Sequence, residues 1–485
     1  PGGWWARGDR ATTIEGASAV AYNFALDLFD RLNTGGAEVP VGFLNVSKGS
    51  TSIEAWIARD AIDARQGDEK YGVVYDYLSE RGRLLSEEEF NTKGSQNFNQ
   101  VSAMFNSKIA QVTNLYVKGI LWYQGENNVG NEIAGQYYAQ ALQLLRQDWS
   151  RWFNEGKEEL TLLFTQVAPQ NYGYEGEALA YMWEGMAQAY SECPDYISMA
   201  TIYDVPLDWY NEDFPYRTPG HTLVKQPVGQ RFAAFAYNRF YGGAGALSSP
   251  VLDTAAFEGG KATLTFKNAS ALQTTDGLDP VGFTLCGANR IFYPADAVLN
   301  ADGSVTLSSR WVKEPVAAAY GFSEMIMRAN VCSDEGYPIA PFRTDKVAST
   351  YYHPKDWQLC DATQYFVSYG SGKDPEQAKF RDGYTVSSNL SLAVTQDGDY
   401  GNALKLSYTL RGREEFWISP VLGQNKTDGR FEQLADYDTL SFKVRNTQGR
   451  DVSVSVRVTL ASGQSWGAEN LGGKAAAGAN SDGDE

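Results

Sequence analysis

The chain has 485 residues, enough for about three domains, since a domain averages roughly 150 residues. Hydrophobic residues make up 43% of the chain and charged residues 21%, so apolar surface suffices for packed cores and a wholly disordered chain is excluded. The 41 basic and 59 acidic residues give a formal charge of −18, which disfavours binding to nucleic acid. No run reaches the roughly 18 apolar residues of a membrane span. We therefore expect no nucleic-acid partner and no membrane span.

Few residues are suited to metal chemistry. The four cysteines lie far apart without CxxC spacing, which argues against a zinc site or a disulfide-stapled scaffold. The only two histidines are His221 and His353, so a catalytic histidine must be one of these two. We predict neither a metal nor a cofactor.

The first half of the chain, residues 1–246, alternates between helix and strand patterns. Its predicted helices are 17–32, 53–62, 136–153, 178–191 and 226–241, and its predicted strands are 39–46, 117–123, 160–168 and 197–202. Repeated alternation of this kind is typical of a parallel sheet covered by helices on both faces. Ligands of such sheets bind beyond the carboxyl ends of the strands, so functional residues should follow each predicted strand.

The pattern then changes to β. Short alternating strands separated by Gly and Asp turns predict an all-β antiparallel domain over residues 247–350. Residues 351–471 alternate cleanly over 452–458, which is typical of a β-sandwich. The remaining residues, 472–485, are mainly Gly, Ala, Asp and Ser and cannot bury a core, so we expect a disordered tail.

A turn rich in small residues follows the predicted strand 39–46. It places Gly49 at the start of a helix, where exposed backbone N–H groups can stabilise an anion. The same residues allow a structural interpretation, in which Gly49 permits a tight turn and Ser50 or Thr51 caps the helix. Spacing alone does not decide between the two.

Two further segments carry candidate functional residues. The polar residues after the predicted strand 117–123 include Gln124, whose amide can donate hydrogen bonds, and Gly125, which allows a close approach to the backbone. A loop just before the helix 226–241 holds His221, a candidate general base, although an isolated loop histidine is more often an ordinary surface residue. His353, in the linker before the last domain, is the weaker candidate.

Together these segments resemble the sialate O-acetylesterase-like carbohydrate esterases of the SGNH hydrolase group. The similarity runs from about residue 4 to residue 345. Its most specific parts are SAVAYNF at 18–24, PVGFLNVSKGSTSIEAW at 40–56, WYQGENN at 122–128, HTLVKQPVGQR at 221–231 and GYPIAPFRTD at 336–345. The resemblance implies a flavodoxin-like α/β domain followed by β-domains, and secretion or a periplasmic location.

The resemblance also implies a serine esterase. His221 takes the proton from a serine hydroxyl, the serine attacks the acetyl carbonyl, and the acyl-enzyme is then hydrolysed. The oxyanion hole comprises the Gly49 N–H, the Gln124 side chain and Gly125. The substrate is an acetylated sugar or glycan, either sialic acid or another acetylated glycan such as xylan.

The chain departs from the family where the nucleophile should be. The family's serine lies in a GQSNM-like block upstream of the 18–24 helix, and this chain has no such block. We therefore predict that the nucleophile is missing and that this chain, a fragment or processed form beginning at Pro1, is inactive. Ser18, on a packed helix, and Ser47, in the oxyanion turn, are poorly suited to replace it. Ser50 stands at the second glycine of the family's GGT triplet.

A second departure concerns the triad acid. The DxxH pattern would put an aspartate where this chain has Thr218, so Asp204, after a predicted strand, is the best remaining carboxylate, with Asp208 and Asp213 behind it.

Three residues are predicted to contact the sugar: Glu126, Asn128 and Arg217. For Glu126 three roles stay open, namely orienting Gln124, touching the sugar, or a structural pairing with the backbone. An acidic sugar would need a cation near the site, and Arg217 and Lys48 are the candidates.

A second function class is a non-catalytic glycan-binding protein on an esterase scaffold. The missing serine block favours it, whereas Gly49, Gln124 and His221 at strand ends oppose it. In the last domain, Trp357, Phe416, Trp417 and Trp466 can stack on sugar rings, or they can fill the core of the sandwich.

Overall fold

A computed structural model describes the protein in two compact units, residues 1–352 with 360–422, and residues 353–359 with 423–485. Up to residue 346 it describes residues 17–36, 38–94, 97–169, 178–205, 222, 224–275, 277, 279–322 and 329–346. Beyond residue 346 it describes the backbone of strands β14 to β26. No helix in these ranges is long and apolar enough to cross a bilayer.

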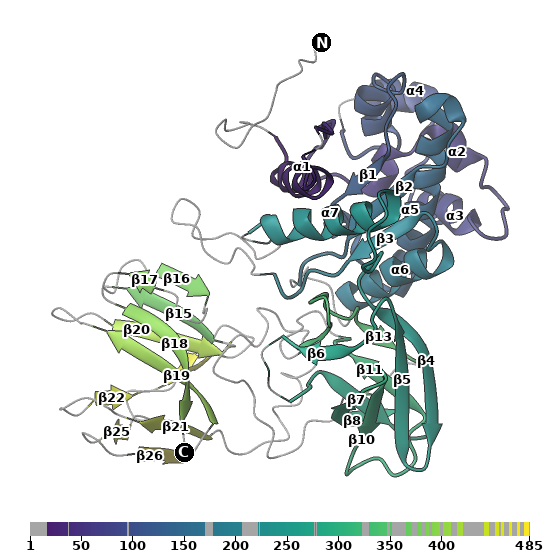
Figure 1. Ribbon diagram of the computed structural model, residues 1–485. Coiled ribbons are helices and arrows are strands. Elements are labelled where there is room, and N and C mark those ends of the chain that lie inside the picture. The colour runs from purple at the N-terminus through teal and green to yellow at the C-terminus, as the bar shows by residue number, and fades with distance from the viewer. Residues whose placement is uncertain are drawn as a thin grey trace. The chain divides into compact units, whose positions relative to one another are not determined.

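A parallel three-stranded sheet forms the centre of the α/β domain, which belongs to the first unit (Figure 1). Its strands are β1 (Gly119–Trp122), β2 (Thr161–Thr165) and β3 (Ile197–Ala200), in the order β1-β2-β3. Every residue of β2 and β3 is buried, as expected for strands covered on both faces. The predicted parallel α/β sheet is therefore confirmed.

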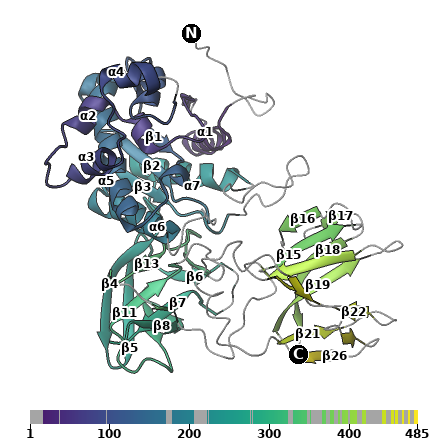
Figure 2. The ribbon, with the colours of Figure 1, turned by 180° about the vertical axis from the view of Figure 1, so that it is seen from behind.

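Helices cover both faces of this sheet. The α-helices of this domain are α1 (Ala19–Leu32), α2 (Arg59–Asp63), α3 (Gly72–Glu80), α4 (Glu87–Glu89), α5 (Glu132–Trp152), α6 (Ala178–Glu192) and α7 (Gln226–Phe240). Its short helical segments are η1 (Ile53–Trp56), η2 (Phe90–Gly94), η3 (Phe105–Ile109), η4 (Glu126–Asn128) and η5 (Phe153–Gly156). Helices α1 and α7 lie on one side and α3, α5 and α6 on the other (Figures 1 and 2). Two separate hydrophobic clusters result, one containing Val20 and Phe232, the other Tyr137 and Trp183.

One predicted strand, 39–46, is wrong. These residues form no strand, and Val39, Pro40, Gly42 and Asn45 are exposed. A strand exists only through ladder hydrogen bonds to a neighbour, and among the described strands β1 pairs with β2 alone, so its outer edge has no partner. The predicted helix 53–62 is also interrupted, because Ile57 and Ala58 have extended backbone angles.

The following β-domain has an antiparallel sheet, β4-β5-β10-β9, a second sheet, β13-β11-β7-β8-β14, and the pair β12-β6. Only β14 pairs in parallel. The strands are β4 (Val251–Glu258), β5 (Lys261–Lys267), β6 (Leu272–Thr274), β7 (Phe283–Cys286), β8 (Ile291–Pro294), β9 (Asp296–Leu299), β10 (Val305–Ser308), β11 (Ala317–Tyr320), β12 (Val331–Ser333), β13 (Phe342–Arg343) and β14 (Thr350–Tyr351). Their inner faces share one hydrophobic cluster that includes Leu264, Leu285 and Tyr320.

The later strands of the first unit form two antiparallel sheets, β16-β15-β20 and β17-β18-β19. These strands are β15 (Tyr365–Gly370), β16 (Glu376–Lys379), β17 (Thr385–Ser387), β18 (Leu390–Asp397), β19 (Gly401–Tyr408) and β20 (Glu415–Pro420).

The second unit contains three antiparallel pairs, β21-β26, β22-β25 and β23-β24. They are β21 (Ser441–Arg445), β22 (Val452–Val454), β23 (Arg457–Thr459), β24 (Ser465–Gly467), β25 (Gly473–Ala475) and β26 (Asn480–Asp484). The strands predicted as one sandwich over 351–471 thus fall into both units. Within the predicted tail, 472–485, the backbone of β25 pairs with β22 and that of β26 pairs with β21.

Arg343 joins the α/β domain to the β-domain. It lies in β13, its side chain is 7% exposed, and its guanidinium forms ion pairs with Glu132 of α5 at 2.5 Å and with Glu184 of α6 at 3.0 Å. The similar PFRTD segment therefore has a structural task in this chain, since one arginine forms ion pairs with carboxylates from two helices.

We expect Arg343→Met to lower the free energy of unfolding by about 3 kcal/mol. Removing one member of a buried ion pair costs roughly 3–5 kcal/mol, and here the two glutamates left behind are partly exposed. Denaturant titration measures the loss. The matched control is Lys267→Met, whose exposed pair with Asp253 should contribute less than about 1 kcal/mol. Equal losses in the two variants would contradict the assignment.

Candidate active site

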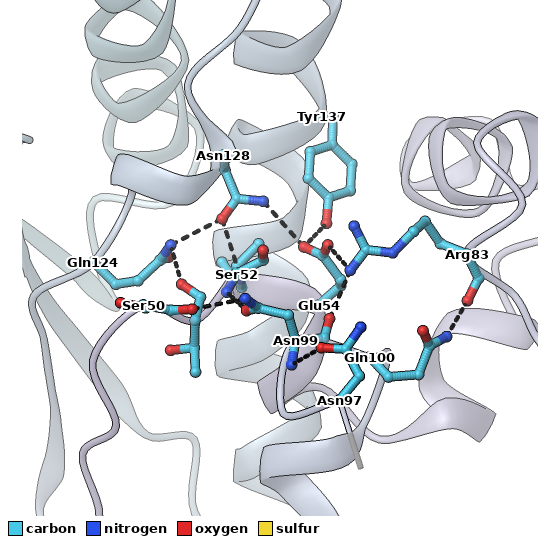
Figure 3. Close-up of polar contacts among 12 residues, drawn as sticks. Ser50, Ser52, Glu54, Arg83, Asn97, Asn99, Gln100, Gln124, Asn128 and Tyr137 are labelled. Carbon is cyan, nitrogen blue, oxygen red and sulfur yellow. Dashed lines mark hydrogen bonds and ion pairs between the residues drawn. The ribbon is translucent and has the colours of Figure 1, made fainter. Parts of the chain in front are cut away.

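Gln124 follows β1 and ties the Gly49 turn to the end of that strand. Its Nε2 donates to the Thr51 carbonyl oxygen at 2.9 Å and to Asn128 Oδ1 at 2.9 Å (Figure 3). Its Oε1 accepts from the Tyr138 hydroxyl at 2.9 Å. An amide nitrogen has two hydrogens, so both are used within the protein in this arrangement. The predicted oxyanion role of Gln124 stays a prediction, and it requires the release of one of these two bonds.

Asn128 supports the same turn from behind. Its Oδ1 accepts from the Ile53 N–H at 3.0 Å, and its Nδ2 donates to Glu54 Oε2 at 3.0 Å. Its exposed fraction is 8%, so a contact with substrate stays a prediction.

Glu54 is the buried anion at the base of this network, with an exposed fraction of 2%. Besides Asn128, its carboxylate accepts from the Tyr137 hydroxyl at 2.9 Å and pairs with Arg83 Nη2 at 3.0 Å (Figure 3). A buried charge is stable only when it is paired and hydrogen-bonded, and here all three partners are present. Sequence reasoning gave Glu54 no role, although it lies within the similar 40–56 block.

The turn itself exposes unpaired backbone donors. Gly49 and Ser50 are exposed, and Ser50 has the left-handed angle φ of 60°. No acceptor for the N–H groups of Gly49, Ser50 or Thr51 occurs among the residues that the structure describes. The alternative in which Ser50 or Thr51 caps a helix is wrong, because η1 begins after Ser52 and no side chain caps it. The turn is therefore suited to bind an anion.

Gly125 is needed where the end of β1 packs on its neighbours. A Cβ atom at this position would lie 2.5 Å from Val167 Cγ2 and 2.9 Å from Met186 Cε. The close approach that the sequence predicted for a substrate is thus made, in this structure, by two core side chains. A part for Gly125 in the oxyanion hole stays a prediction.

We expect Gly125→Ala to destabilise the protein by about 1–3 kcal/mol, the usual range for overpacking a core. The matched control is Gly42→Ala, because a Cβ at Gly42 meets nothing within 4 Å. Thermal unfolding of the two variants measures the difference. A Gly125→Ala protein as stable as the control would show that the end of β1 is loosely packed.

His221 and Arg217 lie outside the described residues, as do Asp208 and Asp213. The residue after His221, Thr222, is described, and its Oγ1 lies 3.5 Å from the hydroxyl of Tyr123. Lys225 donates to the same Oγ1 at 3.0 Å, and its ammonium lies 5.0 Å from the centre of the Tyr123 ring. Because Tyr123 directly precedes Gln124, the end of the histidine loop meets the end of β1.

Burial raises the pKa of Tyr123 to about 12, and the negative charge of Glu126 acts in the same direction. A tyrosine in an unfolded chain ionises near pH 10, so the fold loses stability between about pH 10 and pH 12, where only the unfolded state releases the proton. At pH 11 this loss is about 1.4 kcal/mol. We expect Tyr123→Phe to remove that part of the alkaline destabilisation, measured as unfolding free energy at pH 8 and pH 11. Identical losses in variant and wild type would contradict it.

Asp204 lies just beyond β3 and is held by Arg231 of α7. The guanidinium donates to both carboxylate oxygens, at 2.8 and 2.5 Å, and also to the Thr201 carbonyl oxygen. This pairing fixes the carboxylate at the carboxyl edge of the sheet. Its role as the triad acid stays a prediction, as does a sugar contact for Glu126, which is half-buried in η4.

No group of side chains able to hold a metal ion occurs within the described ranges. The chemistry that these ranges offer is that of backbone donors, amides and paired carboxylates at the carboxyl edge of a parallel sheet.

A parallel sheet between helices, joined to antiparallel β-sheets, fits an α/β esterase fold with a β-rich region. No family model matches the chain. Sialate O-acetylesterases of Pongo abelii and Homo sapiens are 29% and 28% identical to it over 147 residues, 30% of this chain and 24% of each relative. That of Mus musculus is 26% identical over 246 residues, 46% of this chain and 43% of the relative. The chain thus matches less than half the length of these relatives.

Among solved structures, a carbohydrate acetylesterase from Xanthomonas citri has 30% sequence identity and a TM-score of 0.53. The match covers 68% of this chain and 65% of that one. The chain is therefore sialate O-acetylesterase-like in sequence and similar to a carbohydrate esterase in fold, which confirms the resemblance seen in its motifs.

Proposed function

We propose that the protein is a carbohydrate O-acetylesterase that removes acetyl groups from sialic acid or related acetylated glycans. One observation carries the proposal. The N–H groups of Gly49, Ser50 and Thr51 have no acceptor among the described residues, and Gln124 hydrogen-bonds this turn to the end of β1. The histidine loop ends against the same strand end, at Tyr123. The names of the relatives support the same chemistry, and a secreted or periplasmic location fits glycan substrates.

The chemistry is acyl transfer through serine. His221 takes the proton of the serine hydroxyl, the oxygen attacks the acetyl carbonyl, and the protonated histidine then gives its proton to the departing sugar oxygen. Asp204 orients the histidine. The Gly49 turn donates to the oxyanion, each donor lowering the barrier by about 3 kcal/mol, and water then hydrolyses the acyl-enzyme in the same way.

The nucleophile belongs to a segment other than those described. Residues 1–16 contain no serine, and the Ser18 hydroxyl caps α1 by accepting from the Ala21 N–H at 3.3 Å. Ser47 donates to Asn45 Oδ1 at 2.8 Å and shares the turn that must bind the oxyanion. We place the serine on a strand that would pair with the outer edge of β1, which has no partner among the described strands.

Acetate release tests the proposal. O-acetylated sialic acid and acetylated xylo-oligosaccharides are offered to this chain and to a version extended upstream by the natural sequence. We expect no release from this chain and release from the extended protein, which His221→Ala should abolish. Release by this chain that survives Ser18→Ala and is lost in His221→Ala would reveal a nucleophile elsewhere in it.

The alternative is a glycan-binding protein without catalysis, favoured by the missing serine block and by Thr218 in place of an aspartate. It predicts that neither version releases acetate while both bind glycans. Failure of the extended protein to release acetate from any acetylated sugar would therefore favour the binding protein.

A further inference from the structure

The loop of residues 97–100 hydrogen-bonds to the backbone of the Gly49 turn through the side chain of Asn99. Asn99 Oδ1 accepts from the Ser52 N–H at 2.7 Å, and its Nδ2 donates to the Ser50 carbonyl oxygen at 2.7 Å (Figure 3). A single amide thus binds the backbone on both sides of Thr51. Asn99 lies outside the five most specific motifs of the resemblance to the esterase family.

Asn99 is itself held in place from the core. Arg83 Nη2, which pairs with the buried Glu54, also donates to the Asn99 carbonyl oxygen at 2.6 Å. The Asn99 N–H donates to Asn97 Oδ1 at 3.0 Å, and Gln100 Nε2 donates to the Arg83 carbonyl oxygen at 2.6 Å (Figure 3). Asn99, whose side chain binds the turn, is therefore connected through Arg83 to the buried carboxylate of Glu54.

The two hydrogen bonds of the Asn99 side chain set the direction in which the backbone N–H groups of the turn point. In a trans peptide the C=O and the next N–H point in opposite directions. Because the Ser50 carbonyl points to Asn99, the N–H of Thr51 points away from the loop 97–100. In the next peptide the Thr51 carbonyl points to Gln124 and the Ser52 N–H points to Asn99. Gln124 and Asn99 thus hold the turn from opposite sides.

The same two hydrogen bonds stabilise an unfavourable backbone conformation at Ser50. Ser50 has φ of 60°, a region that L residues other than glycine rarely occupy unless their surroundings enforce it. Successive N–H groups around a left-handed residue form a concavity that binds anions. Here these groups belong to Gly49, Ser50 and Thr51.

We propose that Asn99 is a positioning residue: it holds Ser50 in the left-handed conformation so that the N–H groups of residues 49–51 converge on the substrate oxyanion. The inference rests on the proposed function, in which this turn binds that oxyanion. Asn99 acts through the turn and touches no reacting atom.

The test measures anion binding and needs no catalysis. Acetate, whose carboxylate oxygens imitate the oxyanion, is titrated into the full chain, and the amide NMR signals of residues 49–51 are followed. We expect saturable shifts in the wild type and a dissociation constant about tenfold higher in Asn99→Ala, equivalent to about 1.4 kcal/mol. The matched control, Asn106→Ala, changes an exposed asparagine for which no side-chain hydrogen bond is found within the described residues, and should bind as the wild type does.

A second substitution separates positioning from general damage. Glycine adopts positive φ readily, so in a Ser50→Gly background the further change Asn99→Ala should weaken acetate binding by less than about threefold. The double variant also keeps the test decisive if Asn99→Ala alone folds poorly. Equal binding by wild type and Asn99→Ala, or no recovery with Ser50→Gly, would overturn the role of Asn99 and leave the proposed esterase standing. Absence of acetate binding in the wild type would overturn both.

Discussion

The carboxylate of Glu54 is the interaction around which the candidate site is assembled. It is buried, so it must keep its partners, and these come from three separate parts of the chain: Arg83, Asn128 and Tyr137. Asn128 also accepts a hydrogen bond from Gln124, and Arg83 also donates one to the loop 97–100, so both elements are held in place through Glu54. The shape of the Gly49 turn, which would face a substrate, therefore depends on the buried charge of Glu54, which a substrate would not contact.

Much of the α/β domain follows from hydrophobic pattern alone. Strands β2 and β3 are buried throughout and mainly apolar, and helices α6 and α7 lie close to their predicted bounds. Burial on both sheet faces leaves a recognisable apolar run or period in the sequence. Segment 39–46 has the same apolar content but forms no strand. An apolar sequence allows a segment to join a sheet, but a strand forms only where a neighbouring strand is available for hydrogen bonding.

The candidate site was predicted only in part, for a similar reason. Gln124 follows an apolar run and lies just after β1, as the sequence predicted. Gly49 follows segment 39–46, which forms no strand, yet the structure brings the Gly49 turn to Gln124 through Thr51. Asn99 contacts a residue 47 positions away and belongs to no periodic pattern, so only the folded backbone reveals its two bonds. The roles of Arg343 and Glu54 were hidden for the opposite reason. A charged residue in a sequence motif suggests chemistry, whereas here each one is itself buried and forms an ion pair with a partly exposed residue of opposite charge.

The outer edge of β1, which has no partner among the described strands, has a further consequence. Main-chain groups along such an edge bind any extended segment of suitable length with little regard to its side chains, because the ladder hydrogen bonds come from the backbone. A strand supplied as a separate peptide would thus meet a ready-made receptor, and the helices on both faces would select apolar side chains for it.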